Sequence, residues 1–317
     1  MSVVGIDVSK ATLDVAVFDG AKFKTKRFAN HGKGIAALQA WLAERGAQGG
    51  AVGLEATGGY QEAAACALHD AGFAVSVLNP AQVHAFIAAE LGRGKTDALD
   101  ARRIARFMAV HRPPVWTPAP LAVRTLQALV RRLDAVLDLI GQEGNRLDTA
   151  HASVRDSIQT ILTALEHERS ALEARIAQHI DDDPDLRQRR DWLNSIPGIS
   201  ARTSAVVLSH LQALERCKDV RQWVAYAGLD PAIAQSGTSL QRPGHLSKRG
   251  SPALRKALYM PALVAIRHNP TIAAFAQRLR QAGKPGKVVV CAAMRKLMHI
   301  IFGVLKHRTD FQPLVAG

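Results

Sequence analysis

The stretch VVGIDVSKATLDVAVF, residues 3–18, decides the fold of the N-terminal half of the chain. Residues 3–8 are apolar apart from Asp7 and predict a buried strand, while residues 13–18 alternate in polarity and predict the returning strand of a hairpin. The segment Ser9–Thr12 supplies the turn between them. Asp19-Gly20 then turns the chain into a third strand near Phe23–Phe28.

Helices and strands alternate from there to residue 78. Apolar spacing predicts helices over about 33–45 and 60–71 and strands over 51–55 and 73–78. The order β-β-β-α-β-α-β is that of a mixed sheet with helices packed on it. We therefore expect an α/β domain at the N-terminus.

The chain becomes helical after a proline-rich segment at 113–120. Residues 121–180 repeat apolar side chains at three- and four-residue steps, which indicates two long helices. Gly141 and Gly144 allow a turn between them, so an antiparallel hairpin is slightly favoured over a self-associating coiled coil. Three further helices are predicted over about 252–267, 271–282 and 286–307. The fold class is thus α/β plus all-α.

Two segments of the C-terminal half carry possible nucleic-acid contacts. Residues 193–200, LNSIPGIS, resemble a helix-hairpin-helix turn, in which backbone N–H groups receive a phosphate without reading sequence. Ser200 replaces the usual second glycine, and a plain helix–turn–helix packing unit is an equal alternative. Residues 229–252 predict a long, polar, basic loop, and such loops within compact domains are usually functional or disordered.

Four acidic residues predict a metal site in the N-terminal domain. Asp7 lies within a buried strand, where a carboxylate is costly unless it is paired or binds a cation. Glu55 ends another strand, and Asp97 and Asp100 are three residues apart, which puts them on one face of a helix. Carboxylates that converge at a sheet edge repel one another unless a divalent cation lies between them. Each acid alone is better explained as a surface or capping residue, whereas together they predict a Mg²⁺ site.

The charge of the chain is strongly asymmetric. Residues 1–190 carry 23 Lys and Arg against 22 Asp and Glu, whereas residues 191–317 carry 18 against 5. Between residues 231 and 309 there are 14 basic residues and no carboxylate. A basic domain of this kind indicates a polyanionic partner, here nucleic acid. Three distant cysteines and the absence of an uninterrupted apolar run of about 18 residues lead us to expect a cytoplasmic protein without a membrane span.

Five short motifs follow one another along the chain: GIDVSK (5–10), EATG (55–58), KTDALDA (95–101), SIPGI (195–199) and SG (236–237). In this order they resemble the DEDD transposases, the Piv-like insertion-sequence family called "one-ten", whose members include bridge-RNA-guided recombinases. The resemblance covers essentially the whole chain. It implies a RuvC-like RNase H-fold catalytic domain at 1–115, a helical coiled-coil region at 116–185 and a helical transposase domain at 186–317.

The resemblance also implies roles for individual residues. Asp7, Glu55, Asp97 and Asp100 match the metal-binding tetrad, and Ser236 matches the catalytic serine. Without the resemblance, Ser236 would be interpreted as a loop hydroxyl that caps a turn, with Ser239 and Ser247 as rival nucleophiles. Gln235 departs from the pattern at a position where an acid can stand. The predicted phosphate contacts are made by five basic side chains, those of Arg242, Lys248, Arg249, Arg255 and Lys256.

The expected function is that of a DNA transposase or recombinase. The resemblance implies that it cuts and rejoins donor and target DNA through a phosphoserine link, with Mg²⁺ or Mn²⁺ bound, as a homo-oligomer in the bacterial cytoplasm and nucleoid. A bridge RNA as guide agrees with the lack of an obvious base-reading helix. Two alternatives remain: a metal-dependent junction nuclease that uses water as the nucleophile, and a nucleic-acid-binding protein without catalytic activity.

Overall fold

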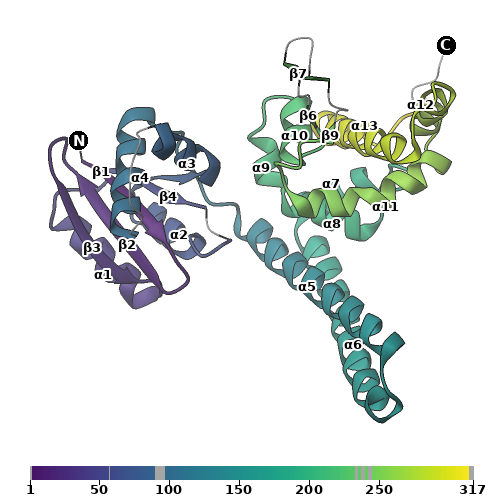
Figure 1. Cartoon of the computed structure of the whole chain (residues 1–317), viewed down its shortest axis with the longest axis horizontal. Helices are drawn as coiled ribbons and strands as arrows, with labels where there is room; N and C mark the ends of the chain where they lie inside the picture. The colour runs from purple at the N-terminus through teal and green to yellow at the C-terminus, as the bar shows by residue number, and fades with distance from the viewer. Residues whose placement is uncertain are drawn as a thin grey trace. The chain divides into compact units, whose positions relative to one another are not determined.

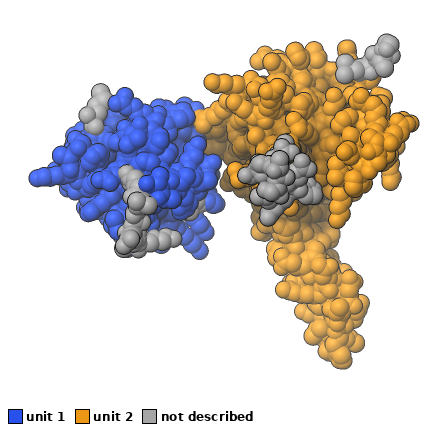
Figure 2. Space-filling view, turned by 45° about the horizontal axis from the view of Figure 1, so that its top comes forward, with its two compact units in different colours: residues 1–118 blue, residues 119–317 orange. Residues whose placement is uncertain are grey.

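The protein folds into two compact units, residues 1–118 and 119–317, which Figure 2 distinguishes by colour. The structure is a computed structural model that describes residues 2–56, 58–89, 97–232, 235–236, 240–241 and 245–313. At residues 97, 235, 236, 240 and 241 the description is of the backbone.

The first unit is built on a five-stranded mixed sheet. Its strands are β1 (Val3–Val8), β2 (Thr12–Phe18), β3 (Phe23–Ala29), β4 (Ala51–Glu55) and β5 (Ala74–Leu78), in the order β3-β2-β1-β4-β5. β1 to β3 form antiparallel pairs, whereas β1, β4 and β5 are parallel. The predicted strands and the mixed sheet are confirmed, and this sheet is compatible with an RNase H-like domain.

Helices cover both faces of this sheet: α1 (Gly32–Ala43), α2 (Glu62–Asp70), α3 (Pro80–Ala89) and α4 (Asp97–His111). α1 and α2 bury their apolar side chains, such as Leu38 and Leu68, with Ile6 and Leu54 of the sheet. α4 packs on the opposite face against β1 and β2. α3 was not expected, because Asn79-Pro80 indicates the end of a strand. Proline is tolerated in the first turn of a helix, where its missing N–H has no intrahelical partner.

The second unit is largely helical and begins with a long hairpin (Figure 1). Its helices are α5 (Leu121–Thr149), α6 (Ala152–Asp182), α7 (Pro184–Asn194), α8 (Ala201–Ser209), α9 (Leu211–Glu215), α10 (Val220–Tyr226), α11 (Pro252–His268), α12 (Pro270–Gln281) and α13 (Gly286–His307). α5 and α6 pack side by side within one chain, as the hairpin interpretation predicted.

The predicted turn of this hairpin is wrong. Gly141 and Gly144 lie inside α5, and the chain turns at Ala150 and His151. His151 begins α6 because its ring nitrogen accepts a hydrogen bond from the Ser153 backbone N–H. A glycine inside a helix costs only about 1 kcal/mol, which a 29-residue helix tolerates.

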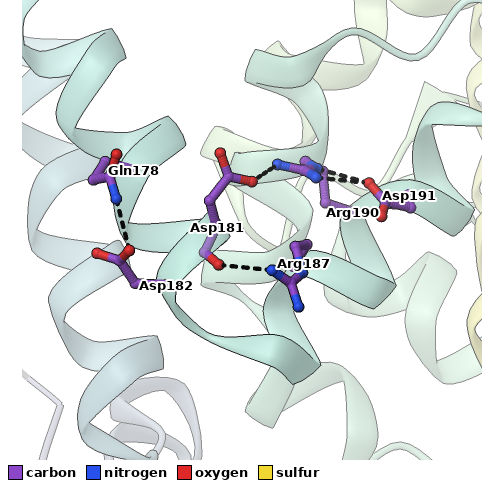
Figure 3. A network of polar contacts seen from close by, with 6 residues as sticks. All are labelled: Gln178, Asp181, Asp182, Arg187, Arg190 and Asp191. Carbon is purple, nitrogen blue, oxygen red and sulfur yellow. Dashed lines mark hydrogen bonds and ion pairs between the residues drawn. The ribbon is translucent and has the colours of Figure 1, made fainter.

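A network of polar contacts fixes the joint between α6 and α7 (Figure 3). The Arg190 guanidinium bonds to the carboxylates of Asp181 and Asp191, and its pKa is raised by both. Asp183 caps α7 by accepting hydrogen bonds from backbone N–H groups. The base of the hairpin therefore belongs to the same core as the helices that follow, with Leu126, Leu193 and Leu297 all fully buried in it.

α13 is long and apolar enough to cross a membrane by length and composition alone, which is weak support for a span. Arg295 and Lys296 lie in the middle of the helix. Its apolar side chains, such as Leu297 and Ile301, are buried against α11 and α12. It therefore packs as a core helix of the second unit.

Candidate functional site

The carboxyl edge of the sheet brings Asp7 and Glu55 together. β1 and β4 are parallel with Ile6 opposite Leu54, so Asp7 and Glu55 come one residue later on neighbouring strands. Since side chains alternate along a strand, both project from the face that also carries Gly5 and Gly53. Their side chains are only partly exposed to solvent.

Two glycines allow α4 to approach this face closely. A Cβ atom at Gly5 would lie 2.3 Å from the Ala101 carbonyl oxygen and 2.3 Å from the Ala105 nitrogen, both of α4. A Cβ at Gly53 would lie 2.5 Å from Cγ of Met108 in the same helix. The absence of side chains at these positions therefore sets α4 directly on β1 and β4. The first turns of α4, with Asp100, are thereby held at the sheet.

A cavity of about 480 Å³ lies where these elements meet. Its acidic lining consists of Asp7, Glu55 and Asp100, from β1, β4 and α4. Among the described residues, the lining also includes two basic or titratable side chains, those of His84 and Arg103. The other described lining residues are apolar: Val83, Ile87 and Ile104. Three of the four predicted acids thus share one cavity.

Arg103 and His84 line this cavity, although neither was predicted to be a site residue. Nη1 of Arg103 lies 2.9 Å from an oxygen of Asp100, and the two side chains are 11% and 21% exposed. Nε2 of His84 lies 3.9 Å from an oxygen of Glu55. The spacing of Arg103 three residues after Asp100 was a usable signal, because such pairs meet on a helix. His84 had none, since its contact depends on the unpredicted α3.

The donor atoms suit a hard divalent cation, but the acids are not arranged as a finished site. All three carboxylates offer oxygens, the ligands that Mg²⁺ prefers. Yet, over the residues that the structure describes, no group of three His, Cys, Asp or Glu side chains is placed to hold an ion. Asp97 is the first residue of α4, and its side chain lies outside the described part of the chain. The four-acid site stays a prediction.

Ser236 lies in residues 231–246, which we call the paired segment because described residues in it form short strand pairs between α10 and α11. β6 (Pro231–Ala232) pairs with β9 (His245–Leu246), and β7 (Gln235–Ser236) pairs with β8 (Leu240–Gln241), both antiparallel. The segment predicted as a loop therefore contains two short ladders. Ser236 stands opposite Leu240 in the ladder of β7 and β8. Its side chain is outside the described atoms, so its role as nucleophile stays a prediction.

Of the two rival serines, Ser247 has described contacts, whereas Ser239 lies outside the described residues. The hydroxyl of Ser247 donates a hydrogen bond to the Asp230 carboxylate, and its oxygen lies 3.4 Å from the Arg249 backbone nitrogen that donates to it. Ser247 therefore already holds the backbone where the paired segment returns to the helices.

The five predicted phosphate-binding side chains are in different environments. Lys248 and Arg249 are exposed, and Lys248 has a left-handed backbone with φ 55°. Nη1 of Arg255 donates to the carbonyl oxygens of Ala227 and Gly250, at 3.0 and 3.1 Å. Lys256 donates to Asp138 of α5 at 2.7 Å. Arg242 lies outside the described residues. Contact with phosphate stays a prediction for all five.

The segment that resembles a helix-hairpin-helix turn, residues 193–200, packs against the second unit itself. Gly198 has φ 103°, and a Cβ there would lie 2.9 Å from the Pro261 carbonyl oxygen of α11. Ser200 begins α8 by accepting a hydrogen bond from the Thr203 backbone N–H. These contacts support the packing interpretation, and phosphate binding at this turn stays a prediction.

Two family models match this chain in separate segments. A model of the IS110-type DEDD kind, described as a transposase, matches residues 4–154. A model described as the transposase IS116/IS110/IS902 family matches residues 190–277. The first match contains the acid-lined cavity, and the second contains the paired segment with Ser236.

The chain is also similar to curated proteins over nearly its whole length. It is 30% identical over 312 residues to the pilin gene-inverting proteins of Moraxella lacunata and Moraxella bovis, which covers 97% of this chain and 97% of each relative. It is 28% identical over 156 residues to an insertion element IS110 uncharacterized 43.6 kDa protein of Streptomyces coelicolor. That match covers 49% of this chain and 37% of the relative.

Proposed function

Because the chain belongs to the IS110-like DEDD transposases, a family that acts on DNA, we propose that it cuts and rejoins DNA through a phosphoserine intermediate at Ser236. Its activity is that of a transposase or DNA recombinase, as its similarity to pilin gene-inverting proteins supports. The observation that carries the proposal is the cavity in which Asp7, Glu55 and Asp100 come from three different elements to one place.

The acids of this cavity would hold the divalent cation. Asp7, Glu55, Asp97 and Asp100 offer carboxylate oxygens, which suit Mg²⁺ and also Mn²⁺. When bound, such an ion supplies positive charge that stabilises the attacking and leaving oxygens of an in-line displacement at phosphorus. The protein contributes the rigid edge of the sheet and the first turns of α4, which keep the acids on one face.

Ser236 would be the nucleophile of the displacement. Its Oγ loses a proton and forms a bond to the phosphorus of a DNA phosphodiester, and the bond from phosphorus to the 3′ oxygen breaks. The 3′ oxygen takes up a proton and leaves as a free hydroxyl. The new serine phosphodiester retains the energy of the broken bond, so a second 3′-hydroxyl can reverse the step without ATP. A serine hydroxyl is a weak nucleophile at neutral pH, so a nearby base or a bound metal ion would have to activate Ser236.

The second unit would bind the nucleic acid. The stretch from residue 231 to residue 309 has no carboxylate of its own, so its 14 cations attract the phosphates of DNA. A bridge RNA as guide and a dimer or tetramer that shares each composite site between protomers are further parts of the proposal, supported by the family resemblance. The exposed Lys248 and Arg249 follow β9 closely in the chain and would contact backbone phosphates.

A covalent-adduct assay tests the proposal. The full chain is incubated with its element's junction DNA, its RNA and Mg²⁺, and a denaturation-resistant protein–DNA band is sought. We expect the band with the wild type and with Ser239→Ala, the matched control, and its loss with Ser236→Ala and Asp7→Asn. DNA cleavage that survives Ser236→Ala would indicate a junction nuclease that uses water. No cleavage by any variant would indicate a binding protein without catalytic activity.

A further inference from the structure

We propose that Arg103 is a positioning residue that holds Asp100 at the acid-lined cavity, and that a divalent cation binds there by displacing the Arg103 guanidinium. This inference rests on the proposed function, because it concerns the same four acids. It adds that a side chain of the protein, Arg103, competes with the cation for the Asp100 carboxylate.

The contact between Arg103 and Asp100 is close and largely sheltered from water. Nη1 lies 2.9 Å from the Asp100 oxygen, at 11% and 21% side-chain exposure. A hydrogen bond between charged groups is stronger than one between neutral groups, and poor access of water strengthens it further. Since Arg103 follows Asp100 by one helical turn, α4 presents both the acid and its partner to the cavity.

The charges of the cavity explain why a cation belongs beside Asp100. Asp7, Glu55 and Asp100 line the same space, and carboxylates that share a space repel one another. The Arg103 guanidinium offsets part of this repulsion in the protein as it stands. A divalent cation would carry twice its charge into the same space, and it would repel the guanidinium while competing for the same oxygen.

The arrangement of the acids agrees with such a competition. They line one cavity, yet across the described part of the chain no three acidic, His or Cys side chains are gathered closely enough to hold an ion. One of them, Asp100, is engaged by Arg103. In the proposed competition, the acids close around a cation as this ion pair opens, and opening it lowers the affinity for the cation.

A neighbouring arginine provides a matched control. Arg102 lies on the same helix and carries the same charge, but its guanidinium lies 5.8 Å from the centre of the Phe23 ring. It is not part of the cavity lining. Removal of the Arg102 charge changes the electrostatic potential around α4 about as much as removal of the Arg103 charge, but it leaves the ion pair between Arg103 and Asp100 intact.

The test is the affinity of the full chain for Mn²⁺, measured by titration calorimetry on metal-free protein. We expect Arg103→Met to bind Mn²⁺ about tenfold more tightly than the wild type, because the cation no longer has to break a charge-assisted hydrogen bond. Arg102→Met and the charge-conserving Arg103→Lys should remain near the wild-type affinity. A second readout is thermal unfolding: Arg103→Met should unfold at a lower temperature in EDTA and gain more from added Mn²⁺.

The outcomes separate this inference from the proposed function. If the affinity of Arg103→Met for Mn²⁺ equals or falls below that of the wild type, the displacement is wrong, but the metal site is still supported. Wild-type protein that binds no Mn²⁺, or an Asp100→Asn variant that binds it as well as the wild type, would overturn the metal site. If Arg103→Met fails to fold, Arg103→Gln provides the same comparison, with circular dichroism as the check on folding.

Discussion

The substitution Gly5→Ala tests how closely α4 is fitted to the sheet. The added Cβ would lie 2.3 Å from two backbone atoms of α4, whereas ordinary contacts of this kind begin at 3.4 Å. α4 would have to retreat by about 1 Å, and its backbone atoms cannot rotate aside as a side chain can. Overpacking of this kind costs roughly 1–3 kcal/mol and occasionally more, and we expect the upper end, about 3 kcal/mol.

Hydrogen exchange on the full chain measures this cost locally. A loss of about 3 kcal/mol speeds the exchange of β1 and α4 amides by about a hundredfold, because each 1.4 kcal/mol is a factor of ten. Gly53→Ala should have a smaller effect, since its Cβ meets side-chain atoms of Met108 and Leu78 rather than backbone. Gly32→Ala, with no neighbouring atom within 4 Å, should have almost none. Unchanged exchange in Gly5→Ala would refute the close packing on which the position of Asp100 depends.

Three further predictions concern the second unit. Gly141→Ala and Gly144→Ala should each stabilise the second unit by about 0.5–1 kcal/mol in thermal unfolding. Both glycines are helical, and no heavy atom outside their own helix lies within 4 Å of the added Cβ. A loss of stability would instead indicate that the hairpin turns at these glycines. Burial, together with the positive charge of Arg131, lowers the pKa of His210 to about 4, while its Nδ1 lies 3.0 Å from the Tyr226 hydroxyl. Since the unfolded chain takes up this proton first, stability should fall by about 3 kcal/mol as the pH drops from about 6.5 to 4, and His210→Gln should remove most of that part of the pH dependence measured by urea unfolding. Arg255→Met leaves two backbone carbonyls without their donor and should lower the free energy of unfolding by about 2 kcal/mol. Arg249→Ala should change the free energy of unfolding by no more than about 0.5 kcal/mol and should weaken DNA binding in a salt-dependent way. The reverse pattern would assign the phosphate contact to Arg255.

Much of the first unit could be predicted from the sequence because its signals are local. The strand VVGIDV and the alternating TLDVAVF need only their own residues to indicate a buried strand and its partner. Asp7, Glu55 and Asp100 line one cavity. Glu55 was a candidate because ligand sites gather at the carboxyl ends of strands, and Asp100 because of its helical spacing from Asp97. The helices of the C-terminal half likewise agree with their apolar spacing.

The parts that were missed depend on contacts distant in sequence or on ambiguous residues. Proline both ends strands and begins helices, so Pro80 concealed α3 and with it the position of His84 beside Glu55. Glycine both makes turns and is tolerated in helices, so Gly141 misplaced the hairpin turn. Arg255 bonds to two backbone carbonyls. Every residue has a backbone carbonyl, so the amino-acid sequence does not indicate which of them a side chain will bind.

In the proposed reaction, Ser236 forms the covalent link to DNA with help from the acid-lined cavity. Mass spectrometry of the nuclease-trimmed adduct identifies the linked residue. We predict a nucleotide attached to Ser236 in the wild type and in Arg102→Met, and no attached nucleotide in Asp7→Asn. A nucleotide on Ser247 or Ser239, or cleaved DNA with no attached nucleotide, would contradict the account.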